Sequence, residues 1–115
     1  MVSKYMDNIK NDEYYINQIL KDIEKILAYT KNISYDKFIG DEQLIDAVLF
    51  RLIQMTESIK KLSDSFKLKN SNINWNEIIG FRNRIVHDYG KTDYSIVYEV
   101  VCNDIEHLMK ELSKI

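Results

Sequence analysis

Residues 74–90 read NWNEIIGFRNRIVHDYG and contain the signals that start and stop a helix. Asn74 can cap the first turn, and Glu77 stands three residues on, which is the spacing of a capping box. Gly90 can supply the left-handed residue at which a helix ends. Apolar side chains recur between these points at helical spacing. The stretch therefore predicts one amphipathic helix with defined ends.

The rest of the chain shows the same helical periodicity. The sequence has no proline and only three glycines, fewer turn residues than a β-rich domain usually needs. We predict helices over residues 4–30, 41–62 and 92–115, a short turn or helix over 34–39, and a loop with a helical turn over 63–72. Their inward stripes are predicted to be Ile9, Ile16, Ile19, Leu20, Ile23, Ile26, Leu27 and Thr30; then Leu44, Ile45, Val48, Leu49, Leu52, Met55, Thr56, Ile59 and Leu62; then Tyr94, Val97, Tyr98, Val101, Ile105, Leu108, Leu112 and Ile115.

These elements indicate an all-α fold, an antiparallel bundle of four to five helices. The 115 residues are enough for a single domain, 1–115, with a modest core, and no linker or internal repeat divides them. Cys102 is predicted to be a thiol of that core. No apolar run reaches the length of a membrane span and no signal pattern opens the chain, so we expect a cytoplasmic protein that does not bind membranes.

The charge balance argues against a protein that coats nucleic acid. The chain has 16 basic and 18 acidic residues and a net charge of -2. Any contact with a phosphate backbone must therefore concentrate positive charge locally. One cluster comprises Arg82, Arg84 and Lys91. A second comprises Lys60, Lys61, Lys67 and Lys69, which we interpret as a solvated helix end.

Arg82 has an unusual place on the helix of residues 74–90. At 100° per residue it falls at the centre of the apolar face, whereas His87 falls about 140° away. A charged group on an apolar face needs a buried partner, a subunit interface or a ligand. Asp46 or Glu57 could be that partner, and Arg82 would then be purely structural. Alternatively the face borders a cleft, and Arg82 awaits an anion.

His87 and Tyr89 are ambiguous when taken alone. A histidine near a helix end is usually a surface or capping residue, and a tyrosine often has a half-buried ring with a wet hydroxyl. Histidine can also exchange a proton near neutral pH. Because one ideal helix would not bring Arg82 and His87 together, either the helix loosens before Gly90 or a second copy of the chain completes the site.

Other chemistries lack support in the sequence. His87 and His107 are the only histidines, and neither has cysteines or carboxylates at metal-ligand spacing. A glycine-rich phosphate loop is absent as well. We therefore expect no metal and no cofactor.

The pattern Arg82-x4-His87-x-Tyr89 resembles the Arg-x4-His-x-Tyr motif of the HepT toxins, within the HEPN ribonuclease superfamily. Residues 75–83, WNEIIGFRN, are similar to the family's tryptophan-led helix entry, although Asn74 stands where proline is frequent. Residues 46–48, 51–52 and 55–58 resemble the family's second helix, with Met-Thr-Glu-Ser where Gly-Glu-Ala is more usual.

This resemblance implies a homodimeric helical bundle that cleaves RNA, a tRNA or an mRNA, without a metal. His87 would be the general acid or base and Arg82 would stabilise charge on the phosphate, with Asn83 and Arg84 as supporting polar and RNA-binding residues. The resemblance also implies a partner, a minimal nucleotidyltransferase antitoxin that attaches AMP to Tyr89. A rival interpretation is a helical binding module that docks a nucleotidyltransferase and has no nuclease activity.

Overall fold

The computed structural model describes residues 11–86 and 93–115, and within them the chain is helical with no strand. The all-α prediction is therefore confirmed. In chain order the helices are α2 (Asp12–Tyr29), α3 (Tyr35–Ile39), α4 (Glu42–Lys60), α5 (Asp64–Lys69), α6 (Trp75–Val86), α7 (Tyr94–Glu99), the π-helix η1 (Val100–Asp104) and α8 (Ile105–Leu112). The predicted inward residue Ile9 lies outside the described residues.

Side chains of the preceding residues begin most of these helices. Asn11, Ser34, Asp41 and Ser63 each accept a hydrogen bond from a backbone N–H of the first turn, at 3.1, 3.2, 3.0 and 3.1 Å. Such caps satisfy donors that have no partner inside the helix. The predicted start of α4 after Asp41 is confirmed.

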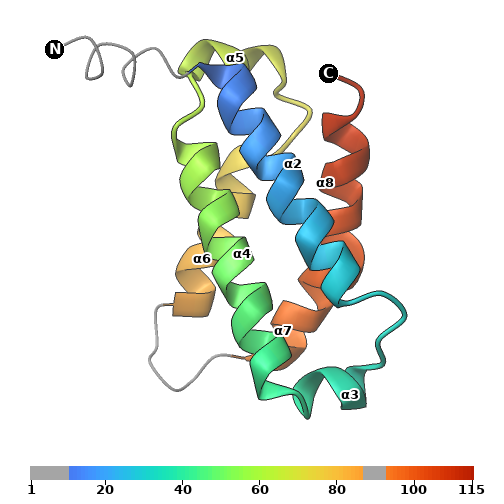
Figure 1. Cartoon of the computed structure of the whole chain (residues 1–115). Helices are drawn as coiled ribbons and strands as arrows, with labels where there is room; N and C mark the ends of the chain where they lie inside the picture. The colour runs from blue at the N-terminus through green and yellow to red at the C-terminus, as the bar shows by residue number, and fades with distance from the viewer. Residues whose placement is uncertain (1–10, 87–92) are drawn as a thin grey trace, which may run out of the picture.

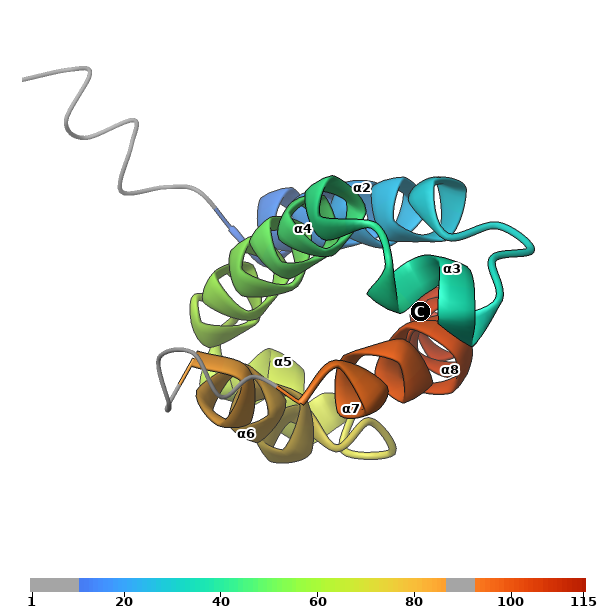
Figure 2. The ribbon, with the colours of Figure 1, turned by 90° about the horizontal axis from the view of Figure 1, so that it is seen from below.

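The long helices form two layers. α2 and α4 lie side by side as one layer, and α6 and the α7–η1–α8 segment form the other (Figures 1 and 2). The short helix α3 closes one end, where it contacts α4 and α7, and α5 lies at the other end (Figure 1). No described helix is long and apolar enough to cross a membrane.

The core lies between the two layers. Ile19, Ile23 and Ile26 of α2 are fully buried, as the predicted stripe requires. The α4 stripe is confirmed from Ile45 to Leu62, with Leu44 and Leu49 only half-buried. Burying such aliphatic side chains supplies the main favourable term in folding.

The short segment before α4 contributes a core residue that the periodicity did not reveal. Phe38 of α3 is fully buried, and its ring lies 5.5 Å from the ring of Tyr98 in an edge arrangement. The Tyr98 hydroxyl donates to the carbonyl oxygen of Ile33 at 2.8 Å. These contacts attach the α2–α4 connection to the C-terminal helical segment.

The C-terminal segment is one continuous helical run from Tyr94 to Leu112, but Val100–Asp104 is wound as a π-helix. Most of the predicted inward stripe is buried there, from Val97 to Leu112. Three inward predictions are wrong: Tyr94 and Ile115 are exposed at the ends of the run, and Cys102 is exposed on the π-helix. Val101 occupies the core position beside Cys102.

Residues 63–72, predicted as a loop with one helical turn, contain the six-residue helix α5. Its start is attached to the beginning of α2, because the Asp12 carboxylate accepts from both the backbone N–H and the hydroxyl of Ser63, each at 2.7 Å. Phe66 packs against the core, with its ring 6.2 Å from that of Trp75. Sequence periodicity cannot show these links, because their partners are distant along the chain.

Candidate functional site

The helix that carries the predicted motif, α6, is fixed firmly at its beginning. Asn74 Oδ1 accepts from the backbone N–H of Glu77 at 3.1 Å, and Asn74 Nδ2 donates to Glu77 Oε2 at 3.1 Å. The predicted cap is therefore confirmed, although the returning bond runs to the Asn74 side chain rather than its backbone. Trp75 is buried, and its indole N–H donates to the carbonyl oxygen of Asn70 at 3.2 Å.

The predicted catalytic residues begin two turns after this anchor. Arg82, Asn83 and Arg84 belong to the backbone of α6, and the side chain of Asn83 is exposed. The side chains of Arg82 and Arg84 lie outside the described part of the structure. His87, Tyr89 and Lys91 lie outside the described residues altogether. The structure thus places the first half of the motif on a well-anchored helix.

The two acids considered as structural partners of Arg82 both lie on α4, the helix beside α6. Asp46 is exposed, and Glu57 is half-exposed with its carboxylate 3.5 Å from the Lys60 ammonium. Because the Arg82 side chain is not described, a structural role for Arg82 stays a prediction.

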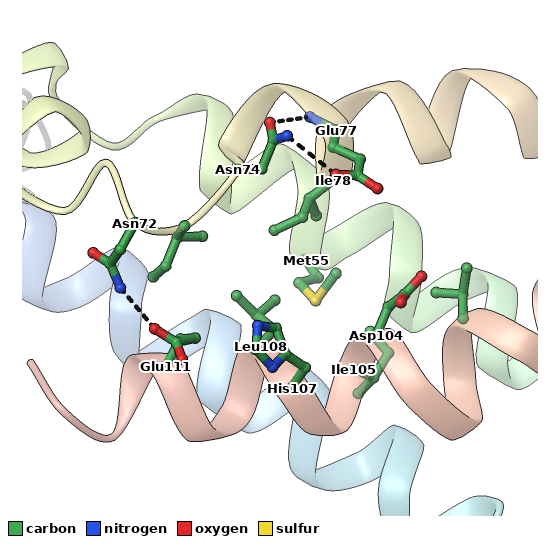
Figure 3. Close-up of a pocket in the computed structure, with 12 residues that line it drawn as sticks. Met55, Asn72, Asn74, Glu77, Ile78, Asp104, Ile105, His107, Leu108 and Glu111 are labelled. Atoms are coloured by element: carbon green, nitrogen blue, oxygen red, sulfur yellow. Dashed lines mark hydrogen bonds between the residues drawn. The ribbon is translucent and has the colours of Figure 1, made fainter.

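A pocket of about 250 Å³ opens between α6, α4 and the η1–α8 segment. Its floor is apolar. Met55 of α4 lies between α6 and α8, and Ile78, Ile105 and Leu108 surround Met55 (Figure 3). Ile78 lies one helical turn before Arg82, on the same side of α6. The pocket therefore borders the face on which the sequence places Arg82. Its complete lining is Met55, Asn72, Ile73, Asn74, Glu77, Ile78, Val100, Asp104, Ile105, His107, Leu108 and Glu111.

The rim of this pocket is acidic. Glu77, Asp104 and Glu111 stand around the apolar floor (Figure 3). Asn72 donates to Glu111 Oε2 at 2.7 Å, and Lys114 lies 3.4 Å from the other carboxylate oxygen. The hydrogen bond from Asn72, followed by that from Lys114, lowers the pKa of Glu111 below its ordinary value. Glu111 is therefore a carboxylate at neutral pH.

A second polar feature lies between α2 and α4, away from the pocket. Asp22 is buried on α2, and its carboxylate accepts from the Arg51 guanidinium of α4 at 3.1 Å. Burial raises the pKa of Asp22, and the hydrogen bond and charge of Arg51 only partly oppose this. The sequence analysis did not identify this pair. The sequence could have indicated this pair only through Asp22, an acid on the predicted inner side of the helix that became α2. The position of Asp22 alone does not indicate that Arg51 is its partner.

In the described part of the chain, no group of three or more His, Cys, Asp or Glu side chains is arranged to hold a metal ion. Pocket-lining His107 has acids nearby, but they are not arranged as ligands.

Comparison with known proteins identifies the family. The model of the family described as "Ribonuclease HepT-like" matches residues 19–115. Among curated proteins, "Putative RNase TTE0752" of Caldanaerobacter subterraneus subsp. tengcongensis is 31% identical over 107 residues, covering 93% of this chain and 96% of that protein. "Probable ribonuclease HepT" of Thermococcus cleftensis is 28% identical over 101 residues, covering 88% of this chain and 92% of that protein.

A third relative is longer than this chain. "Gamma-glutamylcyclotransferase and putative RNase MJ0434" of Methanocaldococcus jannaschii is 37% identical over 106 residues, which cover 92% of this chain but 48% of that protein. No solved structure matches the chain significantly. The matched region, residues 19–115, includes α6 and the whole motif from Arg82 to Tyr89, and the chain belongs to the HepT-like ribonuclease family.

Proposed function

We propose that this protein is a metal-independent endoribonuclease toxin of a toxin–antitoxin pair, active as a homodimer in the cytoplasm. One observation carries the proposal: the motif Arg82-x4-His87-x-Tyr89 begins on α6, a helix fixed by Asn74 and Trp75, within the region that matches a ribonuclease family. A rigid helix is a suitable support for groups that must meet a phosphate with precision.

The proposed reaction uses the RNA's own ribose. Its 2′-hydroxyl attacks the adjacent phosphorus and gives its proton to a base, while the bond to the 5′-oxygen breaks and that oxygen receives a proton. His87 serves as the general base or acid, a role worth roughly 10²–10⁴-fold. Arg82 stabilises the charge that grows on the phosphate oxygens. Asn83, which is exposed, and Arg84 help to hold the RNA backbone.

A second copy of the chain completes the site in this proposal. On one ideal helix Arg82 and His87 point about 140° apart. Two α6 helices that meet at a two-fold axis can bring Arg82 of one copy towards His87 of the other. The homodimer is therefore part of the proposed mechanism.

Regulation would act on Tyr89. A nucleotidyltransferase antitoxin would transfer AMP from ATP to the Tyr89 hydroxyl: the phenol oxygen loses its proton and bonds to the α-phosphorus, the α–β phosphoanhydride bond breaks, and pyrophosphate leaves. The added phosphate brings negative charge and bulk close to Arg82 and His87, which opposes the approach of RNA.

The catalytic assignment is tested by purified variants. His87→Ala should abolish RNA cleavage, and Arg82→Ala should reduce it at least about a hundredfold, while circular dichroism shows an unchanged helix content. Lys25→Ala, which removes a cation from the exposed side of α2, is the matched charge control and should cleave normally. Cleavage by the wild type should survive chelation of metals and leave 2′,3′-cyclic phosphate ends. Full activity of His87→Ala would overturn the assignment.

The regulatory assignment has a separate test. Co-expression with the neighbouring nucleotidyltransferase should add AMP increments to the intact mass, and Tyr89→Phe should remove them. Tyr94→Phe is the matched control, because Tyr94 is an exposed tyrosine close to Tyr89 in the sequence. An unchanged mass in the co-expressed wild type would contradict this assignment.

The net charge of -2 favours one alternative, a binding module that docks a nucleotidyltransferase without cleaving RNA. Expression without the partner separates the two. The enzyme should be toxic, and the toxicity should be lost in Arg82→Ala, whereas the binding module should be harmless in both forms.

A further inference from the structure

Leu68 of α5 stands out on the surface. It is 75% exposed, more than any other large apolar side chain in the described residues, and Lys67 and Lys69 flank it in the sequence. Phe66, two residues earlier, faces the core and packs near Trp75. Two residues rotate a helix by about 200°, so Leu68 points away from the protein. We call Lys67, Leu68 and Lys69 the α5 knob.

Hydrogen bonds to other parts of the protein hold α5, the helix that carries the α5 knob, at both of its ends. The Asp12 carboxylate binds Ser63 at the start of α5 through two hydrogen bonds of 2.7 Å. At the other end, the carbonyl oxygen of Asn70, the residue that ends α5, accepts from the indole N–H of Trp75 on α6 at 3.2 Å. Because α5 is fixed at both ends, presenting Leu68 to a partner loses little conformational entropy.

The pocket between α6 and α8 has the opposite charge to the α5 knob. Its floor is apolar, and Glu77, Asp104 and Glu111 stand on its rim (Figure 3). Glu111 already meets Lys114 at 3.4 Å, so Glu77 and Asp104 contribute most of the negative charge that disfavours an RNA backbone at this place. The same rim attracts an apolar side chain that is flanked by cations.

We propose that the α5 knob of one copy of this chain docks in the pocket of a second copy. Leu68 lies against Ile78, the half-buried apolar residue of the lining, above the buried floor of Met55, Ile105 and Leu108, while Lys67 and Lys69 meet the carboxylates of the rim. The pocket, at about 250 Å³, has room for one leucine side chain. Burial of Leu68 supplies affinity, and the charges set orientation and specificity.

This contact joins two different surfaces, so every copy offers both a knob and a pocket. It uses residues of α4, α5, α6, η1 and α8 that precede or lie apart from the Arg82–Tyr89 motif. Its residues on α6, Glu77 and Ile78, lie one turn or more before Arg82, so the contact borders the proposed catalytic dimer interface without using the motif. The contact would assemble either single chains or dimers into larger species. Failure of the ribonuclease proposal would leave it untouched.

Leu68→Asp tests the apolar half of the proposal. Sedimentation equilibrium should show a wild-type mass that rises with concentration, and Leu68→Asp should weaken this step on the order of tenfold or more. The control is Ile39→Asp, another exposed apolar residue, placed on α3 at the other end of the bundle, and it should assemble like the wild type. Equal masses for wild type and Leu68→Asp at all concentrations would overturn the proposal.

A charge exchange tests the polar half. Lys67→Glu/Lys69→Glu reverses the knob, and Glu77→Lys/Asp104→Lys reverses two carboxylates of the rim. Each double variant alone should fail to make the concentration-dependent step, and a chain that carries all four substitutions should recover it, because its reversed knob matches its reversed pocket. A fourfold variant that assembles no better than the double variants would overturn the pairing. So would loss of RNA binding in Lys67→Glu/Lys69→Glu with unchanged assembly, which would make the knob an RNA contact instead.

Discussion

Asp22 and Arg51 show how one residue's environment depends on a distant part of the chain. Asp22 lies on the buried side of α2, and its charge is compensated by a guanidinium from α4. The raised pKa means that burial penalises the ionised carboxylate more than Arg51 stabilises it. Such a pair adds little net stability, but removing the Arg51 side chain would leave the buried Asp22 carboxylate without its partner, which destabilises the fold.

The pKa of Glu111 is shifted in the opposite direction to that of Asp22, because the neighbours of Glu111 stabilise its charged form. Asn72→Ala removes the hydrogen bond that contributes most to the lowered pKa, so the pKa of Glu111 should rise towards its ordinary value. A lowered folded-state pKa favours the native state above the unfolded pKa, and this contribution is lost as pH falls through the folded value. The wild type should therefore lose more stability than Asn72→Ala on acidification from neutral pH.

Side-chain carboxyl shifts measured by NMR against pH would check this expectation, with Glu106 as the internal control, since its long 3.9 Å contact with Lys110 is unaffected by the substitution. An unchanged titration of Glu111 in Asn72→Ala would contradict the role of the Asn72 hydrogen bond in lowering its pKa.

For single residues, the sequence predicted helix-capping side chains better than it predicted hydrogen-bonded or charged side-chain pairs. Asp41 and Asn74 act within three residues of themselves, so their roles follow from local spacing. The partners of Asp22 and Asp12 lie 29 and 51 residues away, and their identity depends on how the helices cross. Arg82, His87 and Tyr89 were identified by their pattern, whose geometry stays a prediction.

Among the elements, α6 is fixed at its beginning by the Asn74 cap and by the buried side chain of Trp75. Trp75 fills the corner between α5 and α6 and also donates its indole N–H to Asn70. Trp75→Ala should lower the free energy of unfolding by about 3–5 kcal/mol, because it leaves a cavity and an unpaired carbonyl. Urea denaturation followed by circular dichroism measures this loss.

Phe50→Ala is the matched control for that experiment, because Phe50 is an aromatic residue on the exposed side of α4. Its contact with the Arg51 guanidinium, 5.7 Å from the ring centre, is worth about 1 kcal/mol at most at an exposed site. Similar losses in the two variants would show that Trp75 does not anchor α6.

The long elements were predictable and the short ones less so. Stripes of five or more apolar residues identified α2 and α4, since burial of one face imposes the helical period. The helices α3 and α5 have five and six residues, too few for a period to show. The sequence did not predict the π-helix at all, because its apolar residues fit an ordinary α-helical stripe.

For the molecule as a whole, the prediction of one domain over residues 1–115 can be tested with its single tryptophan. Fluorescence of Trp75 reports the corner between α5 and α6, whereas far-ultraviolet circular dichroism reports all helices. If the two layers share one core, both signals should change at the same urea concentration when measured at one protein concentration. A fluorescence midpoint at lower urea would show that this corner unfolds separately.

The π-helix at Val100–Asp104 has a consequence for how the chain can change in length. A π turn contains one residue more than an α turn, so it absorbs a residue without rotating the helix that follows. Removing one residue here would convert the run to plain α-helix and still leave Leu108 and Leu112 facing the core. Elsewhere in the long helices, the same deletion would turn every later side chain by about 100°. This stretch is therefore where a single codon could be gained or lost at least cost to the fold.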